Sequence, residues 1–285
     1  MPLDLALLKY IPGYTEFNAQ DSFGRFALLV PFVDNPLQLR GKAQTPLCRK
    51  GALLYHDCMQ RVRVKICGVR DPVQAMRIAQ MGADAVGLVF ASSPRWVSPE
   101  QARAVSDALP AFVQAVGVFV NDDADTINRV VQRVGLDLVQ LHGDESPELV
   151  EHIRVPCIKA FAVSDKSWID RVRAWLECVC DRRRLKAILL DAYDPQGRGG
   201  TGQRFNWDWV AQARAEDQLR GLPPLILSGG LDDSVVSDAI ELVQPWAVDV
   251  SSGVESSPGV KDLKKIERFI GATREGSELR SEFWM

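Results

Sequence analysis

Short apolar runs recur along the chain from residue 61 onward. Each run is followed by a loop that contains Gly, Pro, Asp or Ser, and then by a longer segment with the spacing of an amphipathic helix. Eight such units occur between residues 61 and 273. The apolar runs cover residues 61–66, 84–90, 114–120, 137–142, 157–163, 186–191, 224–229 and 246–251.

Helices are expected between these runs, for example at 71–81, 99–109, 123–134 and 232–243. Several begin with Asp, Ser or Pro, which cap or pre-form a first helical turn. Strands rich in Val, Ile and Leu that alternate with helices indicate a parallel sheet covered by helices. Eight units favour a closed (β/α)8 TIM barrel of the α/β class. A doubly wound open sheet is the alternative, but its GxGxxG fingerprint is absent after the first run.

The chain ends do not share this pattern. Residues 1–60 lack the repeat, and we expect a non-barrel N-terminal extension that is either poorly ordered or derived from a misplaced start site, with translation beginning at Met59. Residues 61–273 are expected to form the catalytic barrel domain. The polar tail, residues 274–285, is expected to be frayed.

Composition narrows the class of protein. The 285 residues are 46% hydrophobic and 25% charged, with a net charge of -3, which indicates no general affinity for nucleic acid or anionic membranes. The sequence has no apolar stretch near the ~20 residues that span a membrane, and no secretory signal. We therefore expect a cytoplasmic protein, monomeric by default. The six cysteines are too scattered for a disulfide framework, and the CxC pair Cys178 and Cys180 lacks further ligands for zinc, so no metal is expected.

In such a barrel, catalytic groups project from the carboxyl ends of the strands and the loops that follow. Glycine and serine loops follow the seventh and eighth runs, at Gly229-Gly230 and Ser251-Ser252-Gly253. Backbone N–H groups free of side chains can bind a phosphate there, although Gly-Gly could also form only a tight turn. The loop 194–205 carries four glycines and is either a lid that closes over substrate or a plain surface loop.

Ionisable groups also stand at these strand ends. Asp191 ends the sixth run, where partial desolvation would favour its proton-donating form, and Cys67 ends the first run. An acid and a base on opposite sides of a sugar phosphate suit a proton-shuffling isomerisation that needs no cofactor. Arg95, after the second run, could bind a substrate carboxylate in a bidentate manner or lie exposed on Trp96. A buried, inert cysteine and a structural aspartate remain the plainer alternatives.

The sequence resembles the phosphoribosylanthranilate isomerase family over about residues 61–271. The stretches that carry the resemblance occur in the family's order. They are VKICG (64–68), GADAVGLVF (82–90), SPRWVSP (93–99), VGVFVN (116–121), VQLHGDE (139–145), LLD (189–191), GGTG (199–202), LSGGL (227–231) and AVDVSSGVESSPGVKD (247–262).

The resemblance implies a (β/α)8 enzyme of tryptophan biosynthesis that carries out an Amadori rearrangement. It assigns the general acid to Asp191, the general base to Cys67 and the grip on the anthranilate carboxylate to Arg95. It also implies a phosphate site at Gly202, Gly230 and the Ser252-Gly253 turn. His142 and Asp249 would contact or orient the substrate.

Other phosphosugar barrels would share the phosphate loops. An epimerase would need metal-binding histidines at strand ends, where only His142 is available, and the related isomerase of histidine biosynthesis would need an aspartate in place of Cys67. A non-catalytic sugar-phosphate sensor would bind its ligand regardless of Cys67 and Asp191. The sequence leaves one question open, which is what lowers the pKa of a catalytic thiol at position 67.

Overall fold

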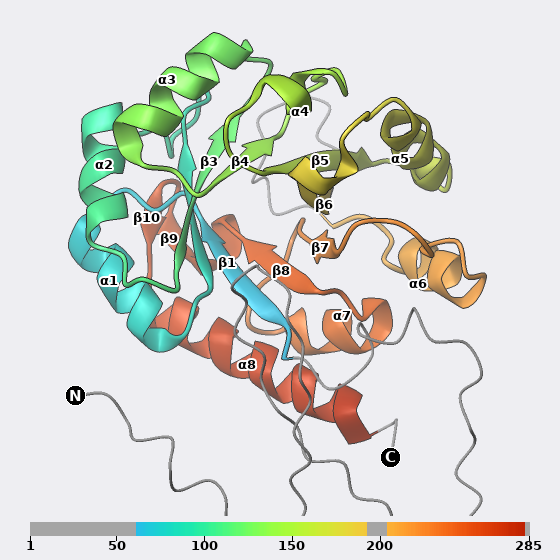
Figure 1. Cartoon of the computed structure of the whole chain (residues 1–285). Helices are drawn as coiled ribbons and strands as arrows, with labels where there is room; N and C mark the ends of the chain where they lie inside the picture. Colours follow the sequence, from blue (N-terminus) through green and yellow to red (C-terminus); the bar gives the residue numbers. More distant parts are fainter. Residues whose placement is uncertain (1–60, 193–203, 283–285) are drawn as a thin grey trace, which may run out of the picture. The chain divides into compact units, whose positions relative to one another are not determined.

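The computed structural model describes residues 61–192 and 204–282. Within these ranges eight parallel strands pair in sequence order and the first pairs with the last, so the sheet is a closed barrel with helices around it (Figure 1). The predicted (β/α)8 barrel is confirmed. Its strands are β1 (Arg63–Cys67), β2 (Ala85–Val89), β3 (Gln114–Phe119), β4 (Leu138–Leu141), β5 (Cys157–Val163), β6 (Leu185–Ala192), β7 (Leu225–Leu227) and β8 (Ala247–Val250).

Helices connect the strands and cover the outside of the barrel (Figure 1). Asp71 caps the first helix through a hydrogen bond from the backbone N–H of Gln74, and Ser98 begins the second with a capping box. The helices are α1 (Pro72–Met81), α2 (Pro99–Asp107), α3 (Ala124–Val134), α4 (Leu149–His152), α5 (Trp168–Glu177), α6 (Asp208–Ala215), α7 (Val236–Val243) and α8 (Leu263–Glu282).

The expected segment boundaries differ from the observed ones mainly at loops. The helix expected at 232–243 begins only at Val236, because the Asp232 side chain accepts hydrogen bonds from the N–H and hydroxyl of Ser234 and forms a turn there. The helix expected at 99–109 ends at Asp107. None of the helices in the described parts of the chain is long and apolar enough to cross a membrane.

Alternate residues of each strand face the barrel interior, because side chains alternate across a strand. A small apolar cluster fills the barrel interior away from the carboxyl ends of the strands. A much larger cluster lies between the strands and the helices. The register of β1 against β8 sets Lys65 opposite Asp249. Cys67 is two residues beyond Lys65, so both side chains lie on the inner face of β1. The barrel therefore buries a charged pair directly below the thiol.

A hairpin follows β8 and precedes the last helix. After the 3-10 turn η3 (Ser252–Val254), β9 (Glu255–Ser257) pairs with β10 (Val260–Lys261). The left-handed backbone of Gly259 makes the turn between them, and a Cβ at this position would lie 2.5 Å from the carbonyl oxygen of Pro94. The hairpin is thus packed against the loop after β2, and it brings Glu255 and Lys261 to the same end of the barrel as Arg95.

The chain ends need one correction. The tail from residue 274 was expected to be frayed, but α8 continues to Glu282. Arg274 donates to the carbonyl oxygen of Met81, and the Ser277 hydroxyl accepts a hydrogen bond from the backbone N–H of Val62. These contacts tie the helix to the start of β1 and to the end of α1, which residue composition alone did not indicate. The expectations for residues 1–60 concern a part of the chain outside the described residues.

Replacement of Ser277 by alanine tests this attachment. The substitution removes the acceptor for the partly buried N–H of Val62, so we expect the free energy of unfolding to fall by about 1–3 kcal/mol. Urea denaturation followed by circular dichroism measures the change. The exposed Glu275→Ala variant in the same helix is the control and should change stability by less than about 0.5 kcal/mol. Equal stability of the two variants would contradict the anchoring role of Ser277.

Candidate active site

The candidate residues gather at the carboxyl ends of the strands. Cys67 is the last residue of β1, Asp191 is the penultimate residue of β6, and His142 directly follows β4. Asp249 lies within β8, one layer deeper, and Arg95 lies in the loop after β2. The glycines and serines predicted to bind phosphate lie in the loops after β7 and β8. Gly202 and most of the glycine-rich loop lie outside the described residues.

Cys67 is 8% exposed and packs against Val89 and Val118. The neighbouring strand makes room for it through Gly87, where a Cβ would lie 2.7 Å from the Cys67 sulfur. Removal from water raises the pKa of the Cys67 thiol above its ordinary value. Lys65 acts against this increase, Asp249 adds to it, and Lys261 also acts against it. The charged groups nearby therefore control how readily this buried thiol ionises.

Lys65 and Asp249 form a buried ion pair inside the barrel. The Nζ of Lys65 donates to Asp249 Oδ1 over 2.8 Å, and the Ser228 hydroxyl donates to Asp249 Oδ2 over 3.4 Å. Burial by itself lowers the pKa of Lys65, but the charges and hydrogen bonds of Asp249 and Cys67 raise it above its ordinary value. Asp249 is thus occupied by protein partners, and its contact with Lys65 places a positive charge beneath Cys67.

Arg95 is buried and does not lie exposed on Trp96, which was the plainer alternative. Its Nε and Nη2 donate to the two carboxylate oxygens of Glu255, each over 2.8 Å. Lys261 donates to the same carboxylate over 2.8 Å. Burial raises the pKa of Glu255, but these two cations outweigh it and hold the pKa below its ordinary value. These bonds to Glu255 use two of the five N–H donors of the guanidinium, and the other three, two of them on Nη1, could bind a further anion.

The site of Arg95 also explains a glycine next to the cysteine. Gly68 has a left-handed backbone with φ of 82°, and a Cβ there would lie 2.7 Å from Cδ of Arg95. A larger residue would therefore be strained and would displace the arginine. Ser251 completes the link between the two ends of the sheet, since its hydroxyl donates to the carbonyl oxygen of Cys67 over 3.2 Å.

Asp191 contacts a histidine at the other side of the mouth. Its Oδ2 lies 3.2 Å from Nε2 of His142, and Nδ1 of His142 lies 2.7 Å from Nε2 of Gln140. Gln140 is buried, and its Oε1 has no hydrogen-bond partner among the described residues. A Cβ at Gly229 would lie 3.1 Å from Asp191 Oδ1, so the loop after β7 passes directly beside the carboxylate. The structure thus brings Asp191, His142 and the loop after β7 together.

The two predicted phosphate loops are in contact. Gly229 and Gly230 both have left-handed backbones, with φ of 84° and 65°. A Cβ at Gly253 would lie only 1.9 Å from the carbonyl oxygen of Leu231, so only glycine allows the loop after β8 to approach the loop after β7 this closely. Ser252 and Gly253 begin the short turn η3. The two loops expected to bind phosphate are therefore adjacent at the mouth of the barrel.

A buried ion pair holds the loops after β3 and β4. Glu145 accepts hydrogen bonds from the backbone N–H groups of Asn121 and Gly143 and from Nζ of Lys159 over 2.8 Å. Asn121 adopts a left-handed backbone, and its side chain accepts from the N–H of Asp144. Burial alone would raise the pKa of Glu145, but Lys159 and the N–H donors hold the pKa below its ordinary value. This network fixes the position of His142 at the mouth.

Four residues at or below the mouth were not given roles from the sequence. They are Lys65, Gln140, Glu255 and Lys261. Lys65 and Gln140 had a detectable signal, because each is a polar residue inside an otherwise apolar run and faces inward by the alternation of the strand. Glu255 and Lys261 had no such signal, since their position depends on the fold of the β9–β10 hairpin.

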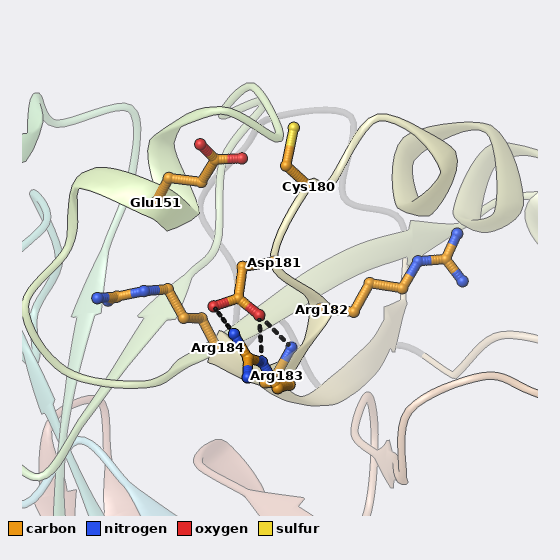
Figure 2. Close-up of a pocket in the computed structure, with 6 residues that line it drawn as sticks. All are labelled: Glu151, Cys180, Asp181, Arg182, Arg183 and Arg184. Atoms are coloured by element: carbon orange, nitrogen blue, oxygen red, sulfur yellow. Dashed lines mark hydrogen bonds and ion pairs between the residues drawn. The ribbon is translucent and has the colours of Figure 1, made fainter.

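A separate pocket lies at the opposite end of β6 (Figure 2). It is lined by Glu151, Cys180 and residues 181–184, and Asp181 accepts hydrogen bonds from the backbone and guanidinium of Arg183. Arg184 donates to the carbonyl oxygen of Ile153. Cys178 and Cys180 are free and exposed. Within residues 61–192 and 204–282, no three or more His, Cys, Asp or Glu side chains are grouped so that they could hold a metal ion. This includes the surroundings of Cys178 and Cys180.

Comparisons with known proteins show what this chain is similar to. The profile of the family N-(5'phosphoribosyl)anthranilate (PRA) isomerase matches residues 64–272. The N-(5'-phosphoribosyl)anthranilate isomerase of Geobacter sulfurreducens is 48% identical over 210 residues, which are 73% of this chain and 97% of the relative.

Two solved structures are also similar to this chain. One is a phosphoribosyl anthranilate isomerase in complex with reduced 1-(o-carboxyphenylamino)-1-deoxyribulose 5-phosphate, with a TM-score of 0.63 and 41% identity over 75% of this chain and 99% of the other. The second contains mutually generated monomers of the dimeric enzyme from Thermotoga maritima, with a TM-score of 0.64 and 40% identity over the same shares.

The Glu145–Lys159 ion pair should make the stability of the protein depend on pH. Glu145→Gln leaves the buried Lys159 unpaired, so we expect a loss of about 3–5 kcal/mol in the free energy of unfolding at pH 7. The folded-state pKa of Glu145 is lowered, so its stabilisation is present above the ordinary value of 4.5 and is lost as the pH falls through the folded-state pKa. The difference between wild type and variant should therefore shrink in acid.

Urea unfolding at a series of pH values measures this difference. The exposed Asp107→Asn variant, which loses its pair with Arg103, is the control and should cost at most about 1 kcal/mol. A Glu145→Gln effect that stays constant from neutral pH into acid would show that the ion pair does not stabilise the loops.

Proposed function

The chain belongs to the N-(5'-phosphoribosyl)anthranilate isomerase family, and we propose that Cys67 and Asp191 divide the proton transfers of its reaction between them. The protein is an isomerase of tryptophan biosynthesis. It catalyses the Amadori rearrangement of N-(5-phosphoribosyl)anthranilate to 1-(2-carboxyphenylamino)-1-deoxyribulose 5-phosphate. The observation that supports the division of roles is the placement of a buried thiol and a half-buried carboxyl at the ends of β1 and β6, three strands apart across β7 and β8.

Asp191 is the proposed general acid. It protonates the ribose ring oxygen, the C–O bond breaks, and the ring opens to a Schiff base of the anthranilate nitrogen. The contact with His142 supports this role, because an imidazole nitrogen 3.2 Å from Oδ2 restricts the direction of the carboxyl. The adjacent Gly229 leaves room for substrate beside it. His142 is accordingly proposed to contact the substrate and to orient Asp191.

Cys67 is the proposed general base. As a thiolate it takes the proton from C2 of the Schiff base, and the electron pair of the C–H bond moves to form the enolamine. The enolamine then tautomerises to the ketoamine product. The barrel supports this role through Gly87 and Ser251, which fix the sulfur and the main chain of Cys67. Proton transfer alone completes this chemistry, so we expect the reaction to need no cofactor and no metal.

The remaining contacts are proposed for the two anionic ends of the substrate. Nη1 of Arg95 would bind the anthranilate carboxylate while Glu255 holds the rest of the guanidinium. The backbone of Gly202, Gly229, Gly230 and residues 251–253 would bind the phosphate. Asp249 was expected to orient substrate directly. Its contacts with Lys65 and Ser228 support an indirect role, through the position of β1.

A cytoplasmic location and a monomeric state are further proposals. The family's role in biosynthesis supports the location. The monomer expected from the sequence remains a prediction, because the related enzyme from Thermotoga maritima is dimeric.

Replacement of the proposed acid and base tests the assignment. We expect Cys67→Ser and Asp191→Asn each to lower kcat by about 10²-fold or more, which is the usual contribution of a general acid or base. The loss of phosphoribosylanthranilate fluorescence measures turnover. Cys178→Ser and Asp144→Asn are matched controls on exposed positions and should keep wild-type rates. Unchanged turnover in either active-site variant would refute the role of that residue, and binding without turnover by the wild type would favour a sensor.

Replacement of the proposed carboxylate ligand tests the other end of the substrate. Lysine cannot reproduce the fork of Arg95, so Arg95→Lys should weaken binding of the reduced product analogue by about 10- to 100-fold. Binding of inorganic phosphate should change much less, because phosphate does not contact Arg95 in this arrangement. Isothermal titration calorimetry measures both, with the exposed Arg70→Lys as control. Equal losses for the two ligands would contradict a specific contact with the carboxylate.

A further inference from the structure

Five charged side chains are buried together around the end of β1. They are Lys65, Arg95, Lys261, Asp249 and Glu255. None of these side chains is more than 8% exposed. Three positive and two negative charges leave an excess of one positive charge in a buried region. Such an excess is costly unless another group supplies a negative charge.

The thiol of Cys67 is the ionisable group that these charges surround. Lys65 lies two residues before it on the inner face of β1 and pairs with Asp249 of β8. Lys261 of β10 donates to Ser251, whose hydroxyl donates to the carbonyl oxygen of Cys67, while β2 and β3 contribute the apolar Val89 and Val118. Loss of the thiol proton would bring the six groups to electrical neutrality. The electrostatic interaction between Cys67 and Lys261 acts on both groups. Burial lowers the pKa of Lys261, and the negative charges of Glu255 and Cys67 act against that decrease.

The excess charge lies in the group of Arg95, Lys261 and Glu255, where two cations share one carboxylate. Lys65 is matched by Asp249 at 2.8 Å, and that aspartate itself opposes the thiolate. Lys261 instead shares the carboxylate of Glu255 with Arg95. Its Nζ also donates to the carbonyl oxygen of Ser251 over 2.9 Å, and the hydroxyl of Ser251 reaches the main chain of Cys67. Lys261 is therefore held firmly beside the end of β1 with a charge that Glu255 only partly cancels.

We propose that Lys261 is a positioning residue for the reaction, whose only partly cancelled charge stabilises the thiolate of Cys67. The proposal rests on the proposed role of Cys67 as general base, and it identifies a positive charge that opposes the effect of burial on the thiol. Lys261 does not touch the substrate in this account. It acts through the ionisation of Cys67 and through the Ser251 contact that fixes the strand end.

The alternative role of Lys261 is purely structural. A lysine that only holds Ser251 and Glu255 would, when replaced, lower stability or weaken substrate binding by the same factor at every pH. A lysine that stabilises the thiolate would instead shift the pH at which Cys67 becomes reactive. The pH profile of the thiol therefore separates the two roles.

The experiment measures the rate of alkylation of Cys67 by iodoacetamide between neutral and alkaline pH. The full-length chain is used, and the labelling of a Cys67→Ser variant is subtracted to remove the other cysteines. Lys261→Met keeps the length of the side chain and removes the charge. We expect alkylation at pH 7 to fall about tenfold and to recover at higher pH, which corresponds to a rise of about one pKa unit.

Two controls accompany this variant. Lys261→Arg keeps the charge and should keep the wild-type profile, and Lys264→Met removes an exposed charge three residues along the chain and should have no effect. Glu255→Gln changes the cluster in the opposite direction, since it adds to the positive excess, and should shift alkylation to lower pH. Because the two substitutions have opposite predicted signs, either one decides the question if circular dichroism shows that the other does not fold.

Each outcome bears on a different claim. An alkylation profile of Lys261→Met that matches wild type, or a Glu255→Gln profile that does not move to lower pH, would overturn the proposal for Lys261. Full activity of Cys67→Ser would instead refute the role of Cys67 as base, whatever the lysine does. Parallel pH profiles of kcat/KM for wild type and Lys261→Met, offset only in height, would assign Lys261 a structural role.

Discussion

The ion pair between Lys65 and Asp249 is the contact on which the site depends. It joins the first strand of the barrel to the last, at the point where the register of β1 against β8 sets the two residues opposite each other. Both side chains are buried, so removal of either partner would leave a charge without compensation, at a cost of about 3–5 kcal/mol. The same pairing of β1 with β8 that closes the barrel therefore also places Lys65 below Cys67.

The rest of the mouth is organised around close approaches that only glycine permits. Gly87 accommodates the sulfur of Cys67, Gly68 accommodates Arg95, and Gly253 lets the loops after β7 and β8 meet. Buried ion pairs then fix the loops, with Glu255 holding Arg95 on one side and Glu145 holding the β3 and β4 loops on the other. The proposed acid and base consequently lie at strand ends, while their partners come from elements far apart in the sequence.

Much of this arrangement could be predicted from the sequence. The period of apolar runs indicated the barrel, and the position of Cys67 and Asp191 at run ends placed them at its mouth. The pairing of Arg95 with Glu255 could not be predicted, because it requires the β9–β10 hairpin to fold back against the loop after β2. The helical structure of residues 274–282 could not be predicted for a related reason. Their polar composition gave no sign of the contacts of Arg274 and Ser277 with residues at the start of the barrel.

The central claim is that Cys67 and Asp191 act on one substrate from two sides of the barrel mouth. A crystal structure of this protein with reduced 1-(o-carboxyphenylamino)-1-deoxyribulose 5-phosphate tests it most directly. We expect the Cys67 sulfur to be the protein atom nearest to C2. We also expect an Asp191 oxygen about 2.6–3.2 Å from the C4 hydroxyl, which is the former ring oxygen. An analogue bound with C2 turned away from Cys67, or with that hydroxyl on another residue, would contradict the claim.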